Sequence, residues 1–399
     1  MARGDGEAAG HHGGAGSGGA VLVLNAGSSS VKYRLIAAGT GRNGPQHLVR
    51  GQIERIGEPD GEAGDHAEAV GQVVEQLRDR PVTAVAHRVV HGGDRFREPV
   101  QIDDATLIAI EELARWAPLH NPAAAAGIRA ARTALPQLPQ LALFDTAFHA
   151  TLPPAAFTYA IDRELAQQHG IRRYGFHGIS IQYVVGETAR LLQRPATQLN
   201  MIVLHLGNGA SATAVADGAS VDTSMGLTPL EGLVMGTRTG DIDPAVAFYL
   251  ARAAGLNLDE VERQCQKHGG LAGLCGDNDL RAVQSRAVQG DPQAQLALDV
   301  YCHRIRKYIG AYHAVLGRLD AVVFTAGVGE NSPVVRAGSL TGLQPLGITV
   351  DHALNDTRGS TARLISPIGS PVAVCVVPTD EERAIAQQTA AKLGLAGNW

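Results

Sequence analysis

Two stretches of the chain, about 180 residues apart, repeat one local pattern. Residues 21–35 (VLVLNAGSSSVKYRL) and residues 202–215 (IVLHLGNGASATAV) each read as an apolar strand, a tight turn of Gly, Asn and Ser, and a second strand. The two turns align Gly27 with Gly209 and Ser29 with Ser211. A turn of this kind exposes backbone N–H groups and small hydroxyls in a concave nest that suits phosphate. The repeat therefore predicts a duplicated domain that holds a polyphosphate between its halves.

The composition is that of an ordinary globular protein and argues against several function classes. Of 399 residues, 45% are hydrophobic and 18% are charged, which suits a soluble chain of two domains. A net charge of −5 and a pI near 6.3 argue against a nucleic-acid surface, and 4% aromatic residues leave few stacking platforms. Residues 1–20 form a glycine-rich tail without the apolar run of a signal peptide, and no segment reaches the roughly 18 apolar residues of a membrane span. We therefore expect a cytoplasmic protein with no nucleic-acid or membrane partner.

The four cysteines indicate reduced thiols. Cys265, Cys275, Cys302 and Cys375 form no C-x-x-C pair, which is typical of a cytosolic enzyme. A metal cluster of Cys265, His268 and Cys275 is the alternative, but its spacing fits no zinc pattern well.

Strand-like and helical runs alternate along the chain, which predicts an α/β fold. In the first half, the patterns predict a hairpin at 21–36, helices at 65–80, 103–116 and 122–134, and strands at 82–90 and 141–144. In the second half, they predict strands at 201–206, 211–216, 321–325 and 372–377, helices at 244–254, 257–268 and 292–318, a loop at 222–243, and a third glycine turn at 327–331. Thr379 to Glu382 reads as a capping box before a C-terminal helix, and the Pro153-Pro154 pair favours a hinge near 146–155.

Two common nucleotide-binding motifs do not account for the glycine turns. No G-x-x-x-x-G-K-[ST] sequence is present, so the chain is not a P-loop NTPase. The run Gly207-x-Gly209-x-x-Ala212 resembles a dinucleotide fingerprint, but that fingerprint needs a helix next and the sequence that follows is strand-like.

The first turn and the next strand end both carry polar residues suited to anions. Asn25, Ser28, Ser30 and Lys32 can hold phosphate oxygens or a metal-bound water, although an ordinary polar hairpin tip would show the same residues. Arg88, in HRVVHGG, stands at a strand end, where its fork suits a carboxylate or phosphate; an ion pair with a surface carboxylate is the alternative.

Three further residues stand where ligands gather. Asp145 lies just beyond a buried strand, and in α/β sheets the carboxyl ends of strands are the usual ligand sites. His177 follows Gly175-Phe176 and precedes Gly178, with little local bulk around it. Arg238 lies in the long loop rich in glycine and charge, and long ordered loops of this kind are usually functional.

With these motifs taken together, the chain from Val21 to Leu395 resembles the acetokinase family of acetate kinases, within the superfamily of acetate and sugar kinases, heat-shock chaperones and actin. The resemblance rests on the motifs NAGSSS at 25–30, HRVVHGG at 87–93, GFHG at 175–178, HLGNG at 205–209, GTRTGDIDP at 236–244 and GVGENS at 327–332. It implies two duplicated actin-like, ribonuclease H-like lobes with a cleft between them. The expected domains are the tail at 1–20, a first lobe at 21–147 plus 382–399, and a second lobe at 148–381 for nucleotide binding and dimerisation.

The resemblance also implies a reaction, ATP + acetate ⇌ ADP + acetyl phosphate, with Mg²⁺ (Mn²⁺ as a substitute) and a homodimer. The matching catalytic positions are Arg88, Asp145, His177 and Arg238, and the metal positions are Asn25 and Glu381. The acetate pocket corresponds to Arg88, Val90, Leu119, Phe176 and Pro229. The nucleotide positions are Lys32, His205, Leu206, Gly207, Asn208, Gly209, Asp279, Leu280, Arg281, Gly327, Val328, Gly329, Glu330 and Asn331.

The chain departs from the family pattern at a few positions. Ile179 and Ile181 stand where the family usually has Thr and His, and Asp380 replaces a common Asn beside Glu381, which adds a charge near the expected metal site. Cys275-Gly-Asp-Asn replaces a more Ser-rich approach to Asp279.

The expected chemistry is in-line attack by the acetate carboxylate on the γ-phosphoryl group. Because simple carboxylic acids titrate near 4, acetate is already ionised at pH 7 and needs no general base. The resemblance implies a role for Asp145 as a proton donor or acceptor, but we expect it to orient an arginine or a magnesium-bound water instead. The lobes are expected to close over the nucleotide and exclude water.

Two alternatives stay open. A propionate kinase of the same family differs by one methylene of substrate, and the branched Val90 favours acetate over a longer acid. An actin-like or chaperone-like nucleotide switch would lack the small apolar acid pocket and the two arginines.

Overall fold

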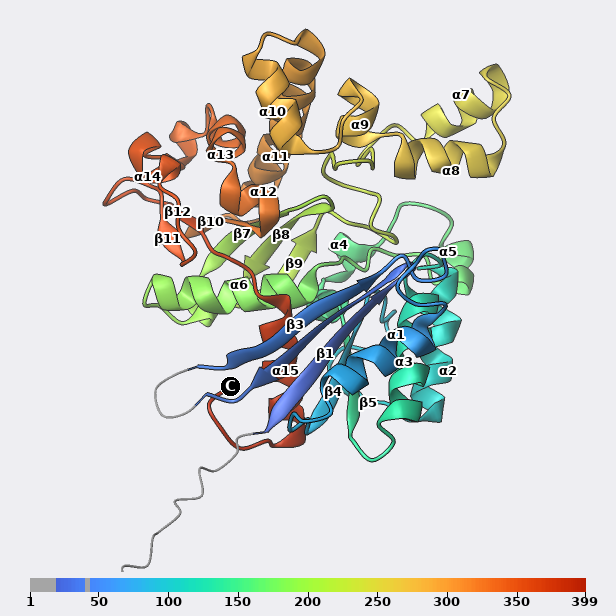
Figure 1. Cartoon of the computed structure of the whole chain (residues 1–399). Coiled ribbons are helices and arrows are strands. Elements are labelled where there is room, and N and C mark those ends of the chain that lie inside the picture. Colours follow the sequence, from blue (N-terminus) through green and yellow to red (C-terminus); the bar gives the residue numbers. More distant parts are fainter. Residues whose placement is uncertain (1–18, 40–43) are drawn as a thin grey trace, which may run out of the picture.

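The computed structural model describes residues 19–39 and 44–399 and contains two six-stranded sheets, each with its own helices (Figure 1). The first sheet occupies the lower half of Figure 1, and the second sheet lies above it. The expected glycine-rich tail at 1–20 lies, up to residue 18, outside the described residues.

The first sheet has the strand order β3-β2-β1-β4-β6-β5. Parallel pairs join β1 to β4 and β4 to β6, whereas β2, β3 and β5 are antiparallel to their neighbours. The strands are β1 (Ala20–Gly27), β2 (Ser30–Ala37), β3 (Gln46–Glu54), β4 (Ala84–Val89), β5 (Val100–Gln101) and β6 (Gln140–Phe144).

The second sheet repeats this arrangement strand for strand, in the order β9-β8-β7-β10-β12-β11. Its central pairs, β7 with β10 and β10 with β12, are parallel, and β8, β9 and β11 are antiparallel to their neighbours. The strands are β7 (Asn200–Leu206), β8 (Ala210–Ala216), β9 (Ala219–Thr223), β10 (Ala321–Thr325), β11 (Arg363–Leu364) and β12 (Ala373–Val376). The predicted duplication and the two-lobe α/β fold are therefore confirmed.

The two opening hairpins differ in the length of their turns, so the residue-by-residue alignment of the turns was wrong. Gly27 ends β1 and pairs with Ser30, which leaves a two-residue turn, whereas residues 207–209 form a three-residue turn between Leu206 and Ala210. Gly209 therefore lies within its loop. Ser211, which was aligned with a turn residue, lies on β8 opposite His205.

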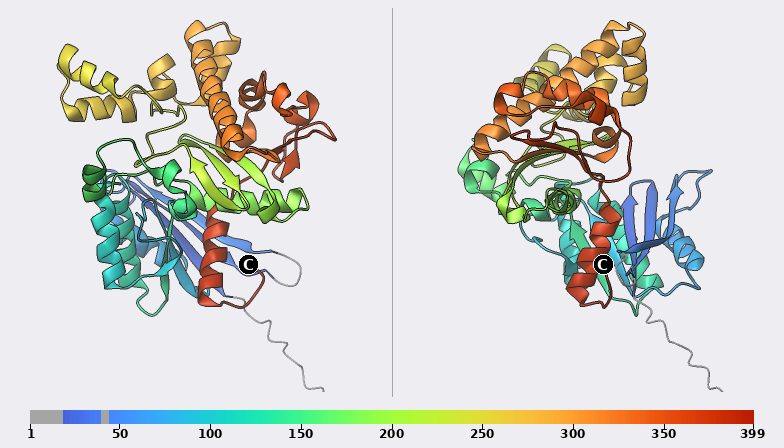
Figure 2. Two further views of the ribbon diagram at one scale, coloured as in Figure 1. Left: turned by 180° about the vertical axis from the view of Figure 1, so that it is seen from behind. Right: turned by 90° about the vertical axis from the view of Figure 1, so that its left-hand side faces the viewer.

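The first sheet is covered on both faces, as the alternation along β1 requires. Leu22 and Leu24 pack with α1 and α3 on one face, and Val21 and Val23 pack with α15 on the other. The helices of this lobe are α1 (His66–Gln76), α2 (Asp104–Glu112), the 3₁₀ turn η1 (Leu113–Arg115), α3 (Asn121–Ala134) and α15 (Glu381–Leu393). The C-terminal helix thus packs against the first sheet, although the chain reaches it from β12 of the second (Figure 2).

The second lobe is built around α11, whose Tyr301, Ile305 and Ile309 pack in one core with Ile202 and Leu204 of β7. Helices α7 and α8 extend away from the rest of the lobe (Figures 1 and 2). The helices are α4 (Pro154–Phe157), α5 (Arg163–His169), α6 (Gly178–Leu191), α7 (Ala245–Ala253), α8 (Leu258–Lys267), α9 (Gly270–Cys275), α10 (Leu280–Val288), α11 (Pro292–Leu316), α12 (Ala326–Asn331), α13 (Pro333–Leu340) and α14 (His352–Asp356), with 3₁₀ turns η2 (Ala147–Thr151), η3 (Ala196–Gln198) and η4 (Gln344–Leu346).

Helix α6 packs against both sheets, and this explains two of the departures from the family pattern. Residues two apart on a helix point in nearly opposite directions. Ile179 packs with Val23, Leu143 and α15 of the first lobe, whereas Ile181 packs with Val203 and Val323 of the second. Both side chains are buried, so these isoleucines form the apolar contact between the lobes.

Two local predictions were wrong. The segment 327–331 is not a turn but helix α12, which begins at Ala326 with a left-handed φ of 64° directly after β10. The C-terminal helix is capped by Asp380, whose carboxylate accepts the Arg383 N–H at 3.1 Å, and not by Thr379. Thr379 is unavailable as a cap because its backbone N–H and its hydroxyl have partners elsewhere.

Other expectations are resolved in part. The loop after β9 has no helix or strand until α7, as predicted. Residues 146–155 form η2 and the start of α4, so a hinge there stays a prediction, as do the domain limits. Across the described residues, no helix has both the length and the apolar character needed to cross a membrane.

Candidate active site at the junction of the lobes

An arginine and an aspartate meet at the carboxyl ends of two neighbouring parallel strands. Arg88 lies near the end of β4 and Asp145 follows β6; the guanidinium donates Nε to Oδ1 at 3.1 Å and Nη2 to Oδ2 at 2.7 Å. Glu381, the first residue of α15, lies 3.5 Å from the same guanidinium. Burial raises the pKa of Asp145 to about 6; Arg88 acts in the opposite direction and Glu381 in the same direction. Arg88 is thus held between two carboxylates with little freedom to turn.

A pair of stacked histidines lies beside the second glycine turn. His177, at the N-terminus of α6, has a left-handed φ of 61°, and its ring stacks on His205 with 4.1 Å between centroids. Its Nδ1 is 3.0 Å from the Ser211 hydroxyl. Burial lowers the pKa of His177 well below its usual value, and His205, Arg88 and Arg238 lower it further. Burial also lowers the pKa of His205 to about 4, so both rings are neutral at pH 7.

Arg238 reaches the same place from the long loop. A Cβ atom on Gly209 would lie 2.8 Å from Nη2 of Arg238 and 3.6 Å from Nε2 of His177, so the guanidinium and the imidazole both border the glycine turn. Within the loop, Arg238 donates Nη1 to the Pro229 carbonyl at 2.5 Å. The site therefore gathers one guanidinium and a neutral imidazole beside Gly209, with Arg88 close enough to lower the pKa of His177.

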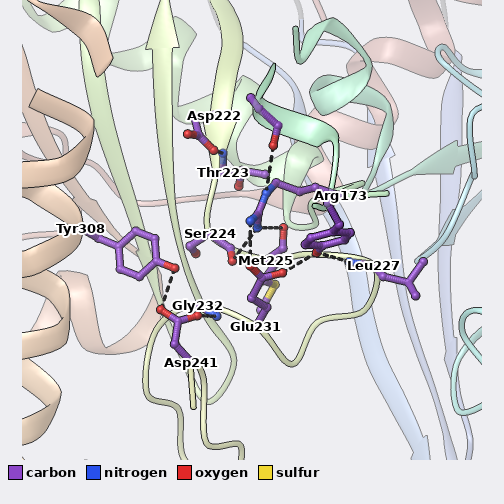
Figure 3. Close-up of polar contacts among 12 residues, drawn as sticks. Arg173, Asp222, Thr223, Ser224, Met225, Leu227, Glu231, Gly232, Asp241 and Tyr308 are labelled. Atoms are coloured by element: carbon purple, nitrogen blue, oxygen red, sulfur yellow. Dashed lines mark hydrogen bonds and ion pairs between the residues drawn. The ribbon is translucent and has the colours of Figure 1, made fainter. Parts of the chain in front are cut away.

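The loop at 224–243 is fixed by two sets of polar contacts (Figure 3). Arg173 donates to the carbonyls of Ser224 and Met225, both at 3.1 Å, and pairs with Glu231 at 2.7 Å. On the other side, Asp241 accepts the Gly232 N–H at 2.8 Å and the Tyr308 hydroxyl at 2.9 Å. These contacts hold a segment without helix or strand in one conformation, which positions Pro229 and Arg238. Glu231 also binds the Tyr159 hydroxyl, which accepts the Leu227 N–H at 3.1 Å.

A buried histidine ties the segment before His177 to the rest of the lobe. His149 donates Nε2 to the Phe176 carbonyl at 2.9 Å, so its Nδ1 accepts the Ser220 hydroxyl at 2.9 Å. Burial lowers the pKa of His149 to about 4, which keeps this tautomer neutral.

The residues expected to form the acetate pocket are brought together only in part. Phe176 is buried against His91, and Val90 packs against the core of the second lobe. Pro229 is half-buried and bonded to Arg238, as described above. Leu119, at 56% exposure, has no described contact with these three, so its part in the pocket stays a prediction.

A cavity of about 1030 Å³ lies in the second lobe next to the glycine turn. Of the nucleotide residues expected from the sequence, its walls include Gly207, Asn208, Asp279, Leu280, Arg281, Gly327, Val328, Glu330 and Asn331. The other expected positions lie outside it: Leu206 is in the core, Gly329 is buried in α12, and His205 and Gly209 lie on the His177 and Arg238 side. Asp279 caps α10 and pairs with Arg281, so this segment is locally ordered.

Sequence reasoning missed several walls of this cavity. They are Gly236, Leu271, Asn278, Gln284, Tyr301, Ser332, Pro333, Arg336, Asp356, Thr357, Arg358, Gly359 and Arg363. Most belong to helices or loops without a glycine signal. Only Arg336 could have been singled out from the sequence, because it is a charged residue among the apolar residues of PVVRAGSL.

Helix α12 is held in place from both sides. Arg336, 1% exposed, donates to the carbonyls of Gly329 and Glu330, both at 2.9 Å, and to the side chain and backbone of Asn355. The Glu330 carboxylate accepts the Thr379 N–H at 3.1 Å. Burial raises the pKa of Glu330, whereas hydrogen bonds from the backbone of Thr379 and Ala326 and the charge of Arg363 lower it.

The expected metal and lysine positions lie in the first lobe. Asn25 and Lys32 are directly paired across the first hairpin, and Lys32 is exposed. Neither lines the cavity, whose walls all come from the second half of the chain. The added charge of Asp380 faces Arg34 at 3.4 Å and His47 at 3.0 Å, so it is compensated within the first lobe.

All four cysteines lie in the described part of the chain as free thiols. Within residues 19–39 and 44–399, no three His, Cys, Asp or Glu side chains form a group suited to a metal, which leaves the alternative of Cys265, His268 and Cys275 without support. Mg²⁺ commonly binds through one or two protein carboxylates together with substrate phosphates. The amide of Asn25 and the carboxylate of Glu381 provide the hard oxygen donors that such a site requires.

Two lobes with one strand order, a cationic junction and a glycine-walled cavity beside it define the actin-like class of two-lobed kinases. The sequence profile of the Acetokinase family matches residues 20–387, and the chain belongs to that family. The chain is 55% identical to an acetate kinase of Streptomyces coelicolor over 402 residues, covering 95% of this chain and 98% of the relative.

Solved structures agree with this assignment. The structure of a Porphyromonas gingivalis acetate kinase superposes with a TM-score of 0.88 at 38% identity, covering 94% of this chain and 100% of the other. A Francisella tularensis propionate kinase gives 0.86 at 41% identity, with 93% and 98% covered.

Proposed function

We propose that this protein is an acetate kinase, which reversibly transfers the γ-phosphoryl group of ATP to the carboxylate of acetate and yields acetyl phosphate and ADP. The observation that carries the proposal is the convergence of charge on His177: Arg238 and His177 border the glycine turn at 207–209, Arg88 is close enough to lower the His177 pKa, and Gly207 and Asn208 of the same turn line the cavity. Phosphoryl transfer requires positioning and charge neutralisation more than covalent chemistry, and this group of side chains supplies both.

The cavity is the proposed nucleotide site. Its volume of about 1030 Å³ is in the upper range of small-molecule pockets, which suits a nucleoside triphosphate. Backbone N–H groups of the turn at 207–209 would hold the phosphates, and Asp279–Arg281 and the backbone of Gly327–Asn331 would contact the nucleoside. Lys32 would approach the phosphates from the first lobe on closure.

In the proposed mechanism, the acetate carboxylate attacks the γ-phosphorus in line with the departing ADP oxygen. Arg88 and Arg238 align the carboxylate with the transferred group and neutralise its charge. The mechanism assigns the Ser211 hydroxyl, 3.0 Å from Nδ1 of His177, as the donor to that nitrogen, so that the proton on Nε2 can be donated to an equatorial phosphoryl oxygen. A neutral imidazole can serve as this donor throughout the reaction.

In this mechanism, Asp145 orients Arg88 and does not transfer a proton. Its two hydrogen bonds hold the guanidinium in one orientation, and acetate is already ionised at pH 7. Asn25 and Glu381 would hold a Mg²⁺ ion, for which Mn²⁺ could substitute. When bound, this ion would neutralise charge on the β- and γ-phosphates.

An acyl-phosphate assay tests the proposal directly. Wild-type protein with ATP and Mg²⁺ is supplied with acetate, propionate or butyrate, and acyl phosphate is trapped as the hydroxamate. We expect the highest kcat/KM with acetate, because the branched Val90 limits the space for a longer acid. One methylene changes binding by about 1–3 kcal/mol, so a preference for propionate would instead identify a propionate kinase. ATP hydrolysis without any acyl phosphate would favour a nucleotide switch and contradict the proposal.

We also propose that the protein acts as a cytoplasmic homodimer. Helix α7 has no buried residue, and it exposes Phe248 at 60% and Tyr249 at 67%, next to Leu258 of α8 at 81%. An apolar face of this kind is typical of a surface that another protein covers. The mass of one chain is 41.7 kDa, and light scattering should report twice this mass for the wild type. Changing Phe248 and Tyr249 to Lys should yield a monomer, and a wild-type monomer would contradict the proposal.

A further inference from the structure

Three consecutive residues at the start of α15, Thr379, Asp380 and Glu381, contact three different parts of the molecule. Here the chain passes from the second lobe to the first, as the red segment of Figure 1 shows. Thr379 binds Glu330 through its backbone, Asp380 pairs with Arg34 and His47 of the first sheet, and Glu381 lies 3.5 Å from Arg88. The segment 379–381 therefore joins the wall of the nucleotide cavity to the Arg88 site.

At the cavity end, the contact is a single side chain. Glu330 belongs to α12 and lines the cavity, but its carboxylate accepts the Thr379 N–H at 3.1 Å. Its carbonyl is bound by the buried Arg336, so the backbone of Glu330 is fixed relative to α13 and α14. The Thr379 hydroxyl is 2.7 Å from Ser180, whose oxygen is 2.9 Å from Nδ1 of His205.

At the other end, the contact reaches the proposed acetate site. Only one residue separates Thr379 from Glu381, so we expect a shift of the Thr379 backbone to alter the position of Glu381 at the start of α15. Glu381 is one of two carboxylates that hold Arg88, the other being Asp145. The position of α12 is thus passed to the Arg88 guanidinium through one hydrogen bond and two peptide units.

We propose that Glu330 is a positioning residue for Arg88, acting through Thr379 and Glu381, and not a group that binds the nucleotide through its carboxylate. The inference deepens the proposed function and rests on it. It assigns the glutamate of the GVGENS motif to the acetate half of the reaction, although this residue lies in the wall of the nucleotide cavity. The position of α12 then affects both the shape of the nucleotide cavity and the orientation of Arg88.

The test compares Glu330→Ala with Glu330→Gln. Glutamine keeps a carbonyl oxygen that can accept the Thr379 N–H, whereas alanine removes the acceptor. For alanine we expect the acetate KM to rise about tenfold while the dissociation constant for ADP, measured by calorimetry without acetate and without Mg²⁺, stays within about twofold. For glutamine we expect both values within about twofold of wild type, since a role in positioning is rescued by the acceptor alone.

Control variants separate positioning from general damage. Asp103→Ala removes the cap of α2, which lies outside the chain of contacts from Glu330 to Arg88, and should lower the melting temperature without changing the acetate KM. If Glu330→Ala does not fold, Glu330→Asp, which withdraws the acceptor by one methylene, should show the same rise in acetate KM.

Other outcomes overturn the inference. A weaker affinity for metal-free ADP with an unchanged acetate KM, in alanine and glutamine alike, would identify a nucleotide contact that depends on charge. An alanine variant with wild-type constants would also contradict it. If wild-type protein forms no acetyl phosphate, the proposed function itself fails, and this inference fails with it.

Discussion

Arg88 and Asp145 lie at the ends of two paired parallel strands and bind each other at two points, Nε to Oδ1 and Nη2 to Oδ2. The backbone supports this pair, because the Asp145 N–H donates to the Val89 carbonyl at 3.0 Å. Asp145 also accepts the Gly178 N–H through its own carbonyl at 2.8 Å. One aspartate therefore fixes both the arginine of the first lobe and the start of the helix that carries His177.

Replacing Asp145 with Asn should impair the use of acetate more than the use of ATP. The variant removes the carboxylate that binds Arg88 at two points, and removing one member of a buried ion pair typically costs about 3–5 kcal/mol. We expect kcat/KM for acetate to fall about 100-fold, with a clear rise in acetate KM and little change in ATP KM. A general base would behave differently: kcat would fall alone, acetate KM would stay unchanged, and the kcat–pH profile would lose its acidic limb.

A methyl group at Gly209 should displace Arg238 without unfolding the protein. The new Cβ of Gly209→Ala would lie 2.8 Å from Nη2 of Arg238, a distance that forces the flexible side chain to move. Because small misplacements of catalytic groups are costly, we expect kcat to fall about 10- to 100-fold with a melting temperature close to wild type. Gly186→Ala on α6 is the matched control, since no atom lies within 4 Å of its new Cβ. Wild-type kcat in Gly209→Ala would show that Arg238 does not act at this position.

The contacts of Arg173 should support both stability and turnover. Arg173→Met removes the ion pair with Glu231 and the bonds to the loop carbonyls, so we expect a loss of about 3 kcal/mol in the free energy of unfolding. We also expect kcat to fall about tenfold, because the loop carries Arg238. Urea unfolding and steady-state kinetics would measure the two effects. Arg190→Met, which breaks an exposed pair with Glu187, should cost less than about 0.5 kcal/mol and leave kcat unchanged.

Stability should fall as the pH drops below about 6.5, the usual pKa of histidine in an unfolded chain. His87, His91, His149 and His205 are buried, and burial lowers the pKa of each to about 4. Between these values the unfolded chain binds protons that the folded protein does not, so each histidine costs about 1.4 kcal/mol at one pH unit below 6.5. Asp145, whose pKa burial raises, acts in the opposite direction below about 6 but is a single group.

Urea midpoints at pH 7.5, 6.5 and 5.5 would measure this slope. His87→Gln offers a neutral side chain opposite Gln140, where His87 Nε2 lies 2.9 Å from Oε1, and should reduce the slope by about one proton. A midpoint that stays constant or rises towards pH 5.5 would show that these histidines titrate normally in the folded protein.

The parts of the fold that the sequence predicts are those with strong local patterns. The hairpins, the long α11 and the buried strands β4, β6 and β10 follow from periodicity and apolar runs. Strand β3 has no such pattern: it forms the edge of its sheet and is mostly exposed, with only Ile53 buried. Its pairing with β2, not its own composition, makes it a strand.

The candidate site divides in a similar way. Arg88, His177 and Arg238 stand next to glycines or strand ends and could be named from the sequence. Leu271, Gln284 and Tyr301 could not, because each lies on a helix whose pattern indicates only packing or surface, and their common cavity depends on contacts between distant elements. Helix α12 was mistaken for a turn because glycine is a poor helix former, and here tertiary contacts from Arg336 override that preference.

The position of Ile179 and Ile181 on opposite sides of α6 has a practical consequence for work with fragments of this protein. A fragment that ends before the helix would expose the apolar surface of Val23 and Leu143, and a fragment that begins at the helix would expose Ile179 itself. Each fragment alone would therefore expose apolar surface to water, and we expect it to aggregate. Segmental isotope labelling or reconstitution from split halves would therefore need both pieces refolded together, or a polar residue at whichever isoleucine the cut leaves uncovered.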